Sequence, residues 1–300
     1  MPIPLRKQLL YNVNLTFPEF RQHDTLGPAS SALSFLDTTC DEWHQRFVER
    51  VFSAIDARQF LPIYRMSDGE YRFALRSGKV RASSIRGKIE LALLRARGLR
   101  GAHKSGSPEY GFEAYSPQEV ELATATFLAS MRRHSAEGLF ALSLHDTRLV
   151  KRYRSVILDW YDDHGIRVDS DNYFLFYSVY VLLHGSDRHR LYRDRRILVV
   201  TSLTPQKKSG ILAGLLACGA RSVEFLEISA SKALFDQVDL TGLETTPDLV
   251  LVGAGIGSVS IMQQLRPLNA VCIDCGFGLS TLADPDLGYR RPYCIPDSEM

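Results

Sequence analysis

Apolar residues are grouped along this chain in two ways. From residue 41 they follow the three-and-four spacing of an amphipathic helix. The residues that share this spacing are Trp43, Phe47, Val51, Phe52 and Ile55. The same reasoning predicts helices over 88–97, 148–161 and 172–184. Another helix is predicted to begin at the capping box of Ser116 and Glu119.

The second grouping is a series of short, almost wholly apolar segments, which are typical of buried strands. They cover residues 60–64, 139–144, 196–200, 222–226, 248–252 and 270–274. Helical segments separate them, including ones that begin at Ser209, near Lys232 and at Ser258. Short apolar strands that alternate with helices are typical of a parallel sheet covered on both faces. The sequence therefore predicts an α/β fold: an open, Rossmann-like, mostly parallel sheet with helices on both faces.

The first forty residues show neither pattern. They contain four prolines and a Ser/Thr-rich stretch near Ser30, so we expect residues 1–40 to form an irregular N-terminal extension. Residues 41–300 are expected to form a single α/β domain. The most apolar stretch, 173–183, is shorter than the roughly 20 residues that cross a bilayer, and residues 1–10 show no signal-peptide core. We therefore expect a cytoplasmic protein without a membrane span.

Composition and charge narrow the class of protein. The chain has 300 residues, of which 45% are hydrophobic and 23% charged, with a net charge of +2. This balance argues against broad nucleic-acid binding, and a chain of this length buries a core without disulfides. Of the five cysteines only Cys272 and Cys275 have the Cys-x-x-Cys spacing, whereas a structural zinc site needs a second pair. We expect reduced, buried cysteines.

Ligands of such sheets bind at the carboxyl ends of the strands, so the residues that follow each strand are the candidates for chemistry. The first strand runs into Arg65-Met-Ser-Asp68-Gly69-Glu70. Two carboxylates around a glycine can face one hard divalent cation, and Arg65 can meet a phosphate oxygen in a bidentate fork. The alternative is a solvated turn in which Asp68 caps the next helix.

Two later strand ends carry hydroxyls and lysines at the start of a helix, an arrangement that favours anion binding. One contains Lys207 and Lys208, and the other contains Ser229, Ser231 and Lys232. For each of them the alternative is a solvated surface loop.

A further strand end, 253–257, is glycine-rich and imitates the dinucleotide-binding fingerprint. Its third glycine stands one place early, and only Asp274 is available as the acidic partner. We therefore expect no NAD or flavin, and interpret these glycines as a turn that lets a helix pack closely on the sheet.

Together these segments resemble the GT-D class of bacterial glycosyltransferases. Residues 65–70 look like that family's Arg-x-Gly-Asp-Gly-Glu stretch, which contains its Asp-x-Glu motif. Residues 228–235 and 271–276 look like its Pro-Ser-Lys-Asn-Ala and Asp-x-Gly elements, in the same order. The resemblance covers about residues 60 to 280. It implies an enzyme that binds a nucleotide-diphosphate sugar and uses a divalent metal, Mn²⁺ or Mg²⁺.

The resemblance also implies roles for individual residues. Asp68 and Glu70 would hold the metal at the donor diphosphate and act in catalysis. Ser229 would act at the sugar–phosphate junction. The remaining contacts to the nucleotide sugar would come from Arg65, Lys207, Ser231, Lys232 and Asp274.

Two departures from the family leave the reaction open. Ser67 replaces the glycine before Asp68, and residues 277–284 lack the family's His-x-Asp segment. Transfer of a sugar from the donor to an acceptor is the first expectation. The alternative is a metal-dependent, non-flavin pyranose–furanose mutase that acts on the donor alone, and the third is a non-catalytic sugar-nucleotide sensor. A homo-oligomer is compatible with all three.

Overall fold

The computed structural model describes residues 11–14, 31–34, 40–77, 85–98, 115–144, 148–276 and 278–283. Seven strands of this part form one sheet in the order β5-β4-β3-β9-β8-β6-β7, and each neighbouring pair is parallel. They are β3 (Leu61–Met66), β4 (Leu139–Leu142), β5 (Tyr173–Leu175), β6 (Arg196–Thr201), β7 (Ser222–Glu227), β8 (Leu249–Gly253) and β9 (Val271–Asp274). The prediction of a parallel α/β sheet is confirmed.

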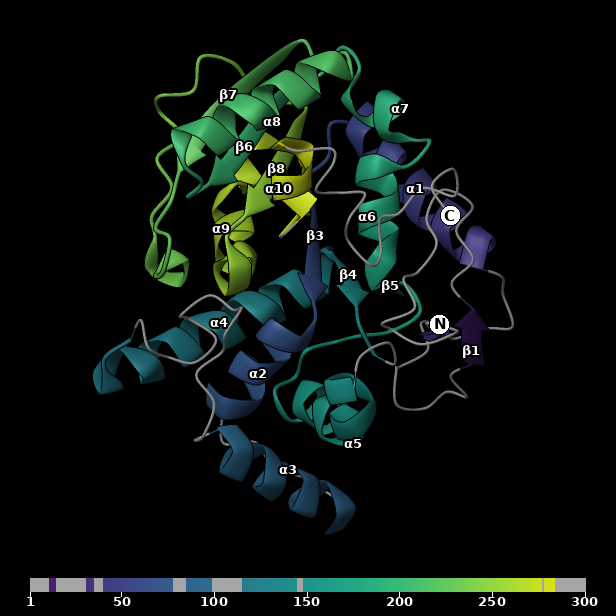
Figure 1. Cartoon of the computed structure of the whole chain (residues 1–300), viewed down its shortest axis with the longest axis vertical. Helices are drawn as coiled ribbons and strands as arrows, with labels where there is room; N and C mark the ends of the chain where they lie inside the picture. Colours follow the sequence, from purple (N-terminus) through teal and green to yellow (C-terminus); the bar gives the residue numbers. More distant parts are fainter. Residues whose placement is uncertain are drawn as a thin grey trace.

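Two groups of helices flank this sheet (Figure 1). In one group α4 contacts α9, α2 contacts α4, and α5 contacts α2 and α3. Its members are α2 (Asp68–Ser77), α3 (Ile85–Gly98), α4 (Pro117–Glu137), α5 (Arg148–Asp163) and α9 (Ser258–Gln264). In the other group α6 contacts α1 and α7, and α8 contacts α10. Its members are α1 (Cys40–Asp56), α6 (Phe176–His184), α7 (Arg188–Tyr192), α8 (Pro205–Ala217) and α10 (Gly278–Ala283). Right-handed crossovers between parallel strands place the two groups on opposite faces.

The described parts of the N-terminal region contain more order than we expected. β1 (Tyr11–Asn14) and β2 (Ser31–Ser34) form an antiparallel pair separate from the main sheet. The other residues before Cys40 lie outside the described part of the chain. Within that part, none of the helices combines the length and the apolar character needed to cross a membrane.

The prediction of a helix over 172–184 is wrong for its first turn. Residues Tyr173–Leu175 form β5, which pairs with β4 through Phe140 and Tyr173, and α6 begins only at Phe176. The stretch is apolar on every side, so its periodicity does not separate a strand from a helix, and pairing with β4 decides. The start of α8 also differs, because the helix begins at Pro205 rather than Ser209.

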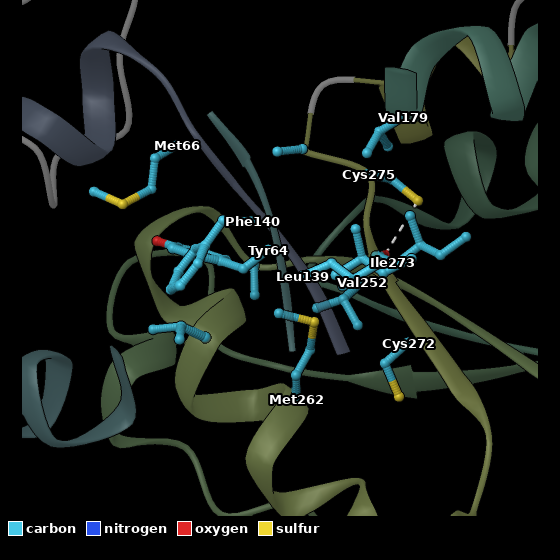
Figure 2. Packing of buried hydrophobic residues seen from close by; sticks show 14 of the residues in the cluster. Tyr64, Met66, Leu139, Phe140, Val179, Val252, Met262, Cys272, Ile273 and Cys275 are labelled. Carbon is cyan, nitrogen blue, oxygen red and sulfur yellow. Dashed lines mark hydrogen bonds between the residues drawn. The ribbon is translucent and has the colours of Figure 1, made fainter. Parts of the chain in front are cut away.

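The core lies between the sheet and both helix layers, and Figure 2 shows part of it. All six residues of β3 are buried, as expected for a central strand of a parallel sheet. Cys272 and Cys275 are free thiols and fully buried, and Figure 2 shows them apart, each among apolar side chains. The expected burial of this pair is therefore found in the structure.

The order of the strands determines which loops meet at the carboxyl edge of the sheet. β3 and β9 are neighbours, so the chain leaving Met66 and the chain leaving Asp274 emerge side by side. β6 and β8 are also neighbours, and their following helices, α8 and α9, lie on opposite faces. In α/β proteins, ligands bind at the carboxyl ends of the strands where the chain reverses in this way.

Candidate functional site

Arg65, the next-to-last residue of β3, is enclosed by protein. Its side chain is 7% exposed. Its Nε donates to the backbone oxygen of Asp274 at 2.6 Å, and its Nη1 donates to the hydroxyl of Tyr180 at 2.6 Å. The guanidinium also lies over the rings of Phe176 and Tyr180, 5.1 and 4.8 Å from their centroids. Arg65 therefore joins β3, β9 and α6 from inside the molecule.

Asp274, at the end of β9, is equally enclosed. Its carboxylate accepts hydrogen bonds from the backbone N–H of Arg65 at 3.3 Å, the hydroxyl of Ser258 at 3.1 Å and the backbone N–H of Gly276 at 3.1 Å. Nη2 of Arg65 lies 3.9 Å from Oδ1. Burial raises the pKa of Asp274, and Arg65 and the hydrogen bonds oppose that rise. The site thus contains a buried, fully hydrogen-bonded carboxylate beside a buried arginine.

Gly276 is required by this arrangement. Its φ of +46° lies in the left-handed region. A Cβ at this position would overlap Nη2 of Arg65. The glycine of the Asp-x-Gly element therefore makes room for the guanidinium.

Glu70 lies in the first turn of α2, half-buried, at the carboxyl end of β3. Its Oε2 accepts a hydrogen bond from the backbone N–H of Ser67 at 2.9 Å, which is one half of a capping box. Burial raises the pKa of Glu70, and the neighbouring charge of Asp274 raises it further, while the Ser67 N–H and Arg65 lower it. The carboxyl ends of β3 and β9 are therefore followed or closed by two carboxyl groups whose negative charges disfavour each other.

The backbone of Asp68 forms the first residue of α2, and its side chain lies outside the described part of the chain. Among the described side chains, no three His, Cys, Asp or Glu residues are grouped to hold a metal ion. The donor set is nevertheless of the right kind for a hard cation, because a positive charge would relieve the repulsion between Glu70 and Asp274. Mg²⁺ and Mn²⁺ sites at substrate phosphates use one or two carboxylates and take other ligands from the substrate and water.

Ser229, after β7, organises a tight turn. Its Oγ accepts hydrogen bonds from the backbone N–H of Ser231 at 3.4 Å and of Lys232 at 3.0 Å. Its own N–H donates to the carboxylate of Asp236 at 2.5 Å. The turn leads into the 3₁₀ helix η4 (Ala233–Phe235), where the sequence predicts a short helix. Ser229, Ser231 and Lys232 are all half-buried.

Lys232 is paired with Glu119 of α4. Its Nζ donates to Oε1 of Glu119 at 2.7 Å, and the two side chains are 41% and 34% exposed. Glu119 also closes the predicted capping box with Ser116. The Lys232 ammonium, with the donors of Ser116, lowers the pKa of Glu119 to about 2. The cation predicted to bind phosphate is therefore present at this edge with a carboxylate as its partner.

The turn at Ser229 is brought back toward the centre of the sheet. η4 contacts the 3₁₀ helix η5 (Gly255–Gly257) that follows β8, and η5 contacts α2. A Cβ on Gly257 would lie 2.6 Å from Cβ of Ala233, so the close approach of η4 requires this glycine. The segment that follows β7, the last strand of the sheet, thus reaches the same carboxyl edge as the start of α2.

The remaining glycines of this turn also serve packing. A Cβ on Gly253 would lie 2.7 Å from Leu279 of α10, and Gly255 has a φ of +55°. These contacts agree with the predicted packing role of the turn.

Lys207 is exposed in the first turn of α8, after β6. The adjacent Lys208 donates to Glu227 at 3.0 Å. Lys207 therefore lies at the carboxyl end of β6, separated in the sheet from β3 by β8 and β9.

Sequence reasoning missed the residues that surround Arg65. Phe176 and Tyr180 are one turn apart on α6, and Ser258 comes from the start of α9. The four-residue spacing of the two aromatics was visible in the sequence, but nothing there showed that α6 faces Arg65. Ser67 and Glu70 match the capping-box pattern, which could have predicted that α2 begins directly after Ser67.

Comparison with known proteins gives the following findings. No family model matches the chain, and no curated protein matches it. One similar solved structure is a selenomethionine-substituted domain of unknown function 1792, with 13% identity, a TM-score of 0.41, and coverage of 83% of this chain and 86% of that one. Another is described as showing that the highly conserved domain of unknown function 1792 has a distinct glycosyltransferase fold. It has 14% identity, a TM-score of 0.40, and coverage of 79% and 82%. Both scores are too low for either likeness to say what this chain does.

Proposed function

We propose that this chain is a metal-dependent glycosyltransferase that uses a nucleotide-diphosphate sugar as donor. The observation that carries the proposal is the carboxyl edge of the sheet. There, Glu70 in the first turn of α2 follows β3, and Asp274 ends the neighbouring strand β9. The hydroxyl- and lysine-bearing turn of Ser229 to Lys232 joins the same edge through η5. Carboxylates for a cation, a lysine for phosphate and hydroxyls for a leaving oxygen are the groups that this reaction needs.

Asp68 and Glu70 would hold the divalent ion, Mn²⁺ or Mg²⁺. When bound, such an ion neutralises the diphosphate and stabilises the charge that develops as the nucleotide leaves. α2 begins at this edge of the sheet, and a helix N-terminus favours an anion.

The turn after β7 would bind the diphosphate directly. In this proposal Lys232 leaves Glu119 and binds a phosphate oxygen, which costs little because exposed ion pairs contribute little to stability. The Ser229 Oγ accepts hydrogen bonds from two backbone N–H groups. Because these occupy its acceptor positions, its hydroxyl proton would be free to donate to the leaving oxygen. Ser231 and Lys207 would supply further contacts to the sugar nucleotide.

Arg65 and Asp274 act differently in this proposal. Both side chains are enclosed and already bind protein groups, so we assign them a positioning role rather than a direct contact with phosphate. Arg65 holds the segment from Asp274 to Gly276 against β3, and this contact determines where α2 begins relative to β9.

The test of the function is an NMR time course of the full chain with Mn²⁺ and a panel of nucleotide sugars, without acceptor. Slow hydrolysis of one donor supports the transferase, because water then replaces the missing acceptor. A new isomer of the donor would instead support the pyranose–furanose mutase. Saturable binding without conversion would support the sensor. If no donor is bound and none is converted, the proposal is overturned.

Lys232→Ala is expected to weaken nucleotide-diphosphate binding by about 1.5–3 kcal/mol, the scale of a hydrogen bond to a charged group. The measurement is isothermal titration calorimetry with the nucleoside diphosphate and metal. Glu119→Gln is the matched variant: glutamine preserves the capping box but releases Lys232, so we expect binding to be as tight or tighter. Unchanged affinity in Lys232→Ala would show that this lysine only pairs with Glu119.

A further inference from the structure

α3 exposes a row of large apolar side chains. Ile85, Ile89 and Leu93 are 79%, 56% and 38% exposed, and their four-residue spacing places them along one face of the helix. Single exposed apolar residues are normal, but a contiguous apolar row on a surface helix marks a site of interaction.

Within the described part of the chain, α3 is held by its other side. Leu91 is 6% exposed and Gly87 is buried, and both lie on the opposite side of the helix from Ile89. α3 packs against α5, and Figure 1 shows it at the end of the molecule farthest from β6 and β7. Among the described residues, α3 is therefore apolar on two sides, and the side with Gly87 and Leu91 is the buried one.

Basic residues accompany the exposed row. Arg86 and Lys88 are exposed in the first turn, and Arg95 and Arg97 belong to the last turns of the same helix. Against these four positive charges α3 has one acidic residue, Glu90, so its net charge is 4 − 1 = +3. The whole chain has a net charge of only +2. The helix that exposes the apolar row is therefore basic, and Arg86 and Lys88 are exposed in the same turns as Ile85 and Ile89.

We propose that α3 is a docking helix for an anionic membrane surface. Ile85, Ile89 and Leu93 would enter the boundary between headgroups and acyl chains, and Arg86 and Lys88 would extend to the lipid phosphates. The 14 residues of α3 span about 21 Å at 1.5 Å per residue, less than the ~30 Å of a hydrocarbon core, so the helix lies on the bilayer rather than crossing it.

Charge distinguishes this partner from a second copy of the chain. Pairing two α3 rows would bring two helices of +3 together, and like charges at a close interface are unfavourable. The anionic leaflet attracts each nearby Lys or Arg and accepts the apolar row at the same time. The partner that satisfies both features is a bilayer that contains anionic lipid.

The test is flotation of the full chain with vesicles of pure phosphatidylglycerol, pure phosphatidylcholine and an equimolar mixture. We expect binding that increases with the share of phosphatidylglycerol and decreases with added salt. Ile89→Ser should lower the partition coefficient about ten-fold, because part of an apolar side chain no longer leaves water. Lys88→Glu should lower it by about 25-fold, through the loss of one attraction and the gain of one repulsion.

Two control variants make the same chemical changes elsewhere on the surface. Leu216→Ser removes an exposed leucine of α8, 47% exposed, and Arg221→Glu reverses an exposed charge next to β7. Both should bind vesicles as the unmodified chain does. Equal binding to the two pure lipids, or controls as defective as the α3 variants, would overturn the proposal. So would a dimer in analytical ultracentrifugation that Ile89→Ser dissociates while vesicles are not bound. None of these measurements uses sugar transfer, so the result does not depend on the proposed function.

Discussion

Glu70→Gln is expected to lower turnover of the nucleotide sugar by at least about 100-fold, because in the proposed function this charge would hold the metal at the diphosphate. The fold should be unaffected, since glutamine at this helical position still accepts the N–H of Ser67. Burial and Asp274 raise the pKa of Glu70, so its charged form is disfavoured in the folded protein. The neutral side chain should therefore leave the free energy of unfolding at pH 7 unchanged or increase it.

The measurement combines turnover at saturating Mn²⁺ with urea unfolding of the same preparation. Glu121→Gln makes the same chemical change at an exposed position of α4 and should leave both quantities unchanged. A Glu70→Gln variant with normal turnover would remove Glu70 from the metal site and leave it as a helix cap. A variant with both low turnover and low stability would assign it a structural role instead.

Arg65→Met is expected to reduce the free energy of unfolding by about 3–5 kcal/mol, the range for removing one partner of a buried ion pair. Asp274 would remain as a buried carboxylate without its cation, and the Tyr180 hydroxyl would lose its donor. Equilibrium urea unfolding at pH 7 measures this loss. The double variant Arg65→Met/Asp274→Asn should be more stable than Arg65→Met alone, because it removes the isolated charge.

The pH dependence of Arg65→Met provides a second check. Burial raises the pKa of Asp274, and without Arg65 less opposes that rise. An acid whose pKa is higher in the folded than in the unfolded state binds its proton more tightly in the folded state, so it destabilises the protein increasingly as pH rises. The stability lost in Arg65→Met should thus shrink as the pH is lowered from 7 toward the ordinary carboxyl range. A loss independent of pH, with additive effects in the double variant, would contradict the coupling of the two side chains.

Local signals were sufficient for most of the fold. The capping box of Ser116 and Glu119 is formed by residues three apart, and the structure contains both of its hydrogen bonds. The apolar runs that predict β6, β8 and β9 are buried almost throughout, so their pattern is sufficient to predict a parallel sheet between two helix layers. Local signals failed at Tyr173–Leu175, where the run is apolar on every side and only pairing with β4 makes it a strand.

In the candidate site, too, local patterns predict the position of the residues and tertiary packing determines their contacts. The apolar runs alone show that Arg65, Glu70 and Asp274 follow or end strands, and strand order then places β3 beside β9. What each side chain does there depends on packing between distant parts of the chain. Arg65 meets Tyr180 across 115 positions, and Lys232 meets Glu119 across 113. Contacts of such separation leave no periodicity or capping signal in the sequence, because they depend on which helix packs on which face. For that reason the sequence identifies these residues only as candidates. Packing distinguishes the enclosed Arg65, which has a positioning role, from Lys232, which is partly exposed.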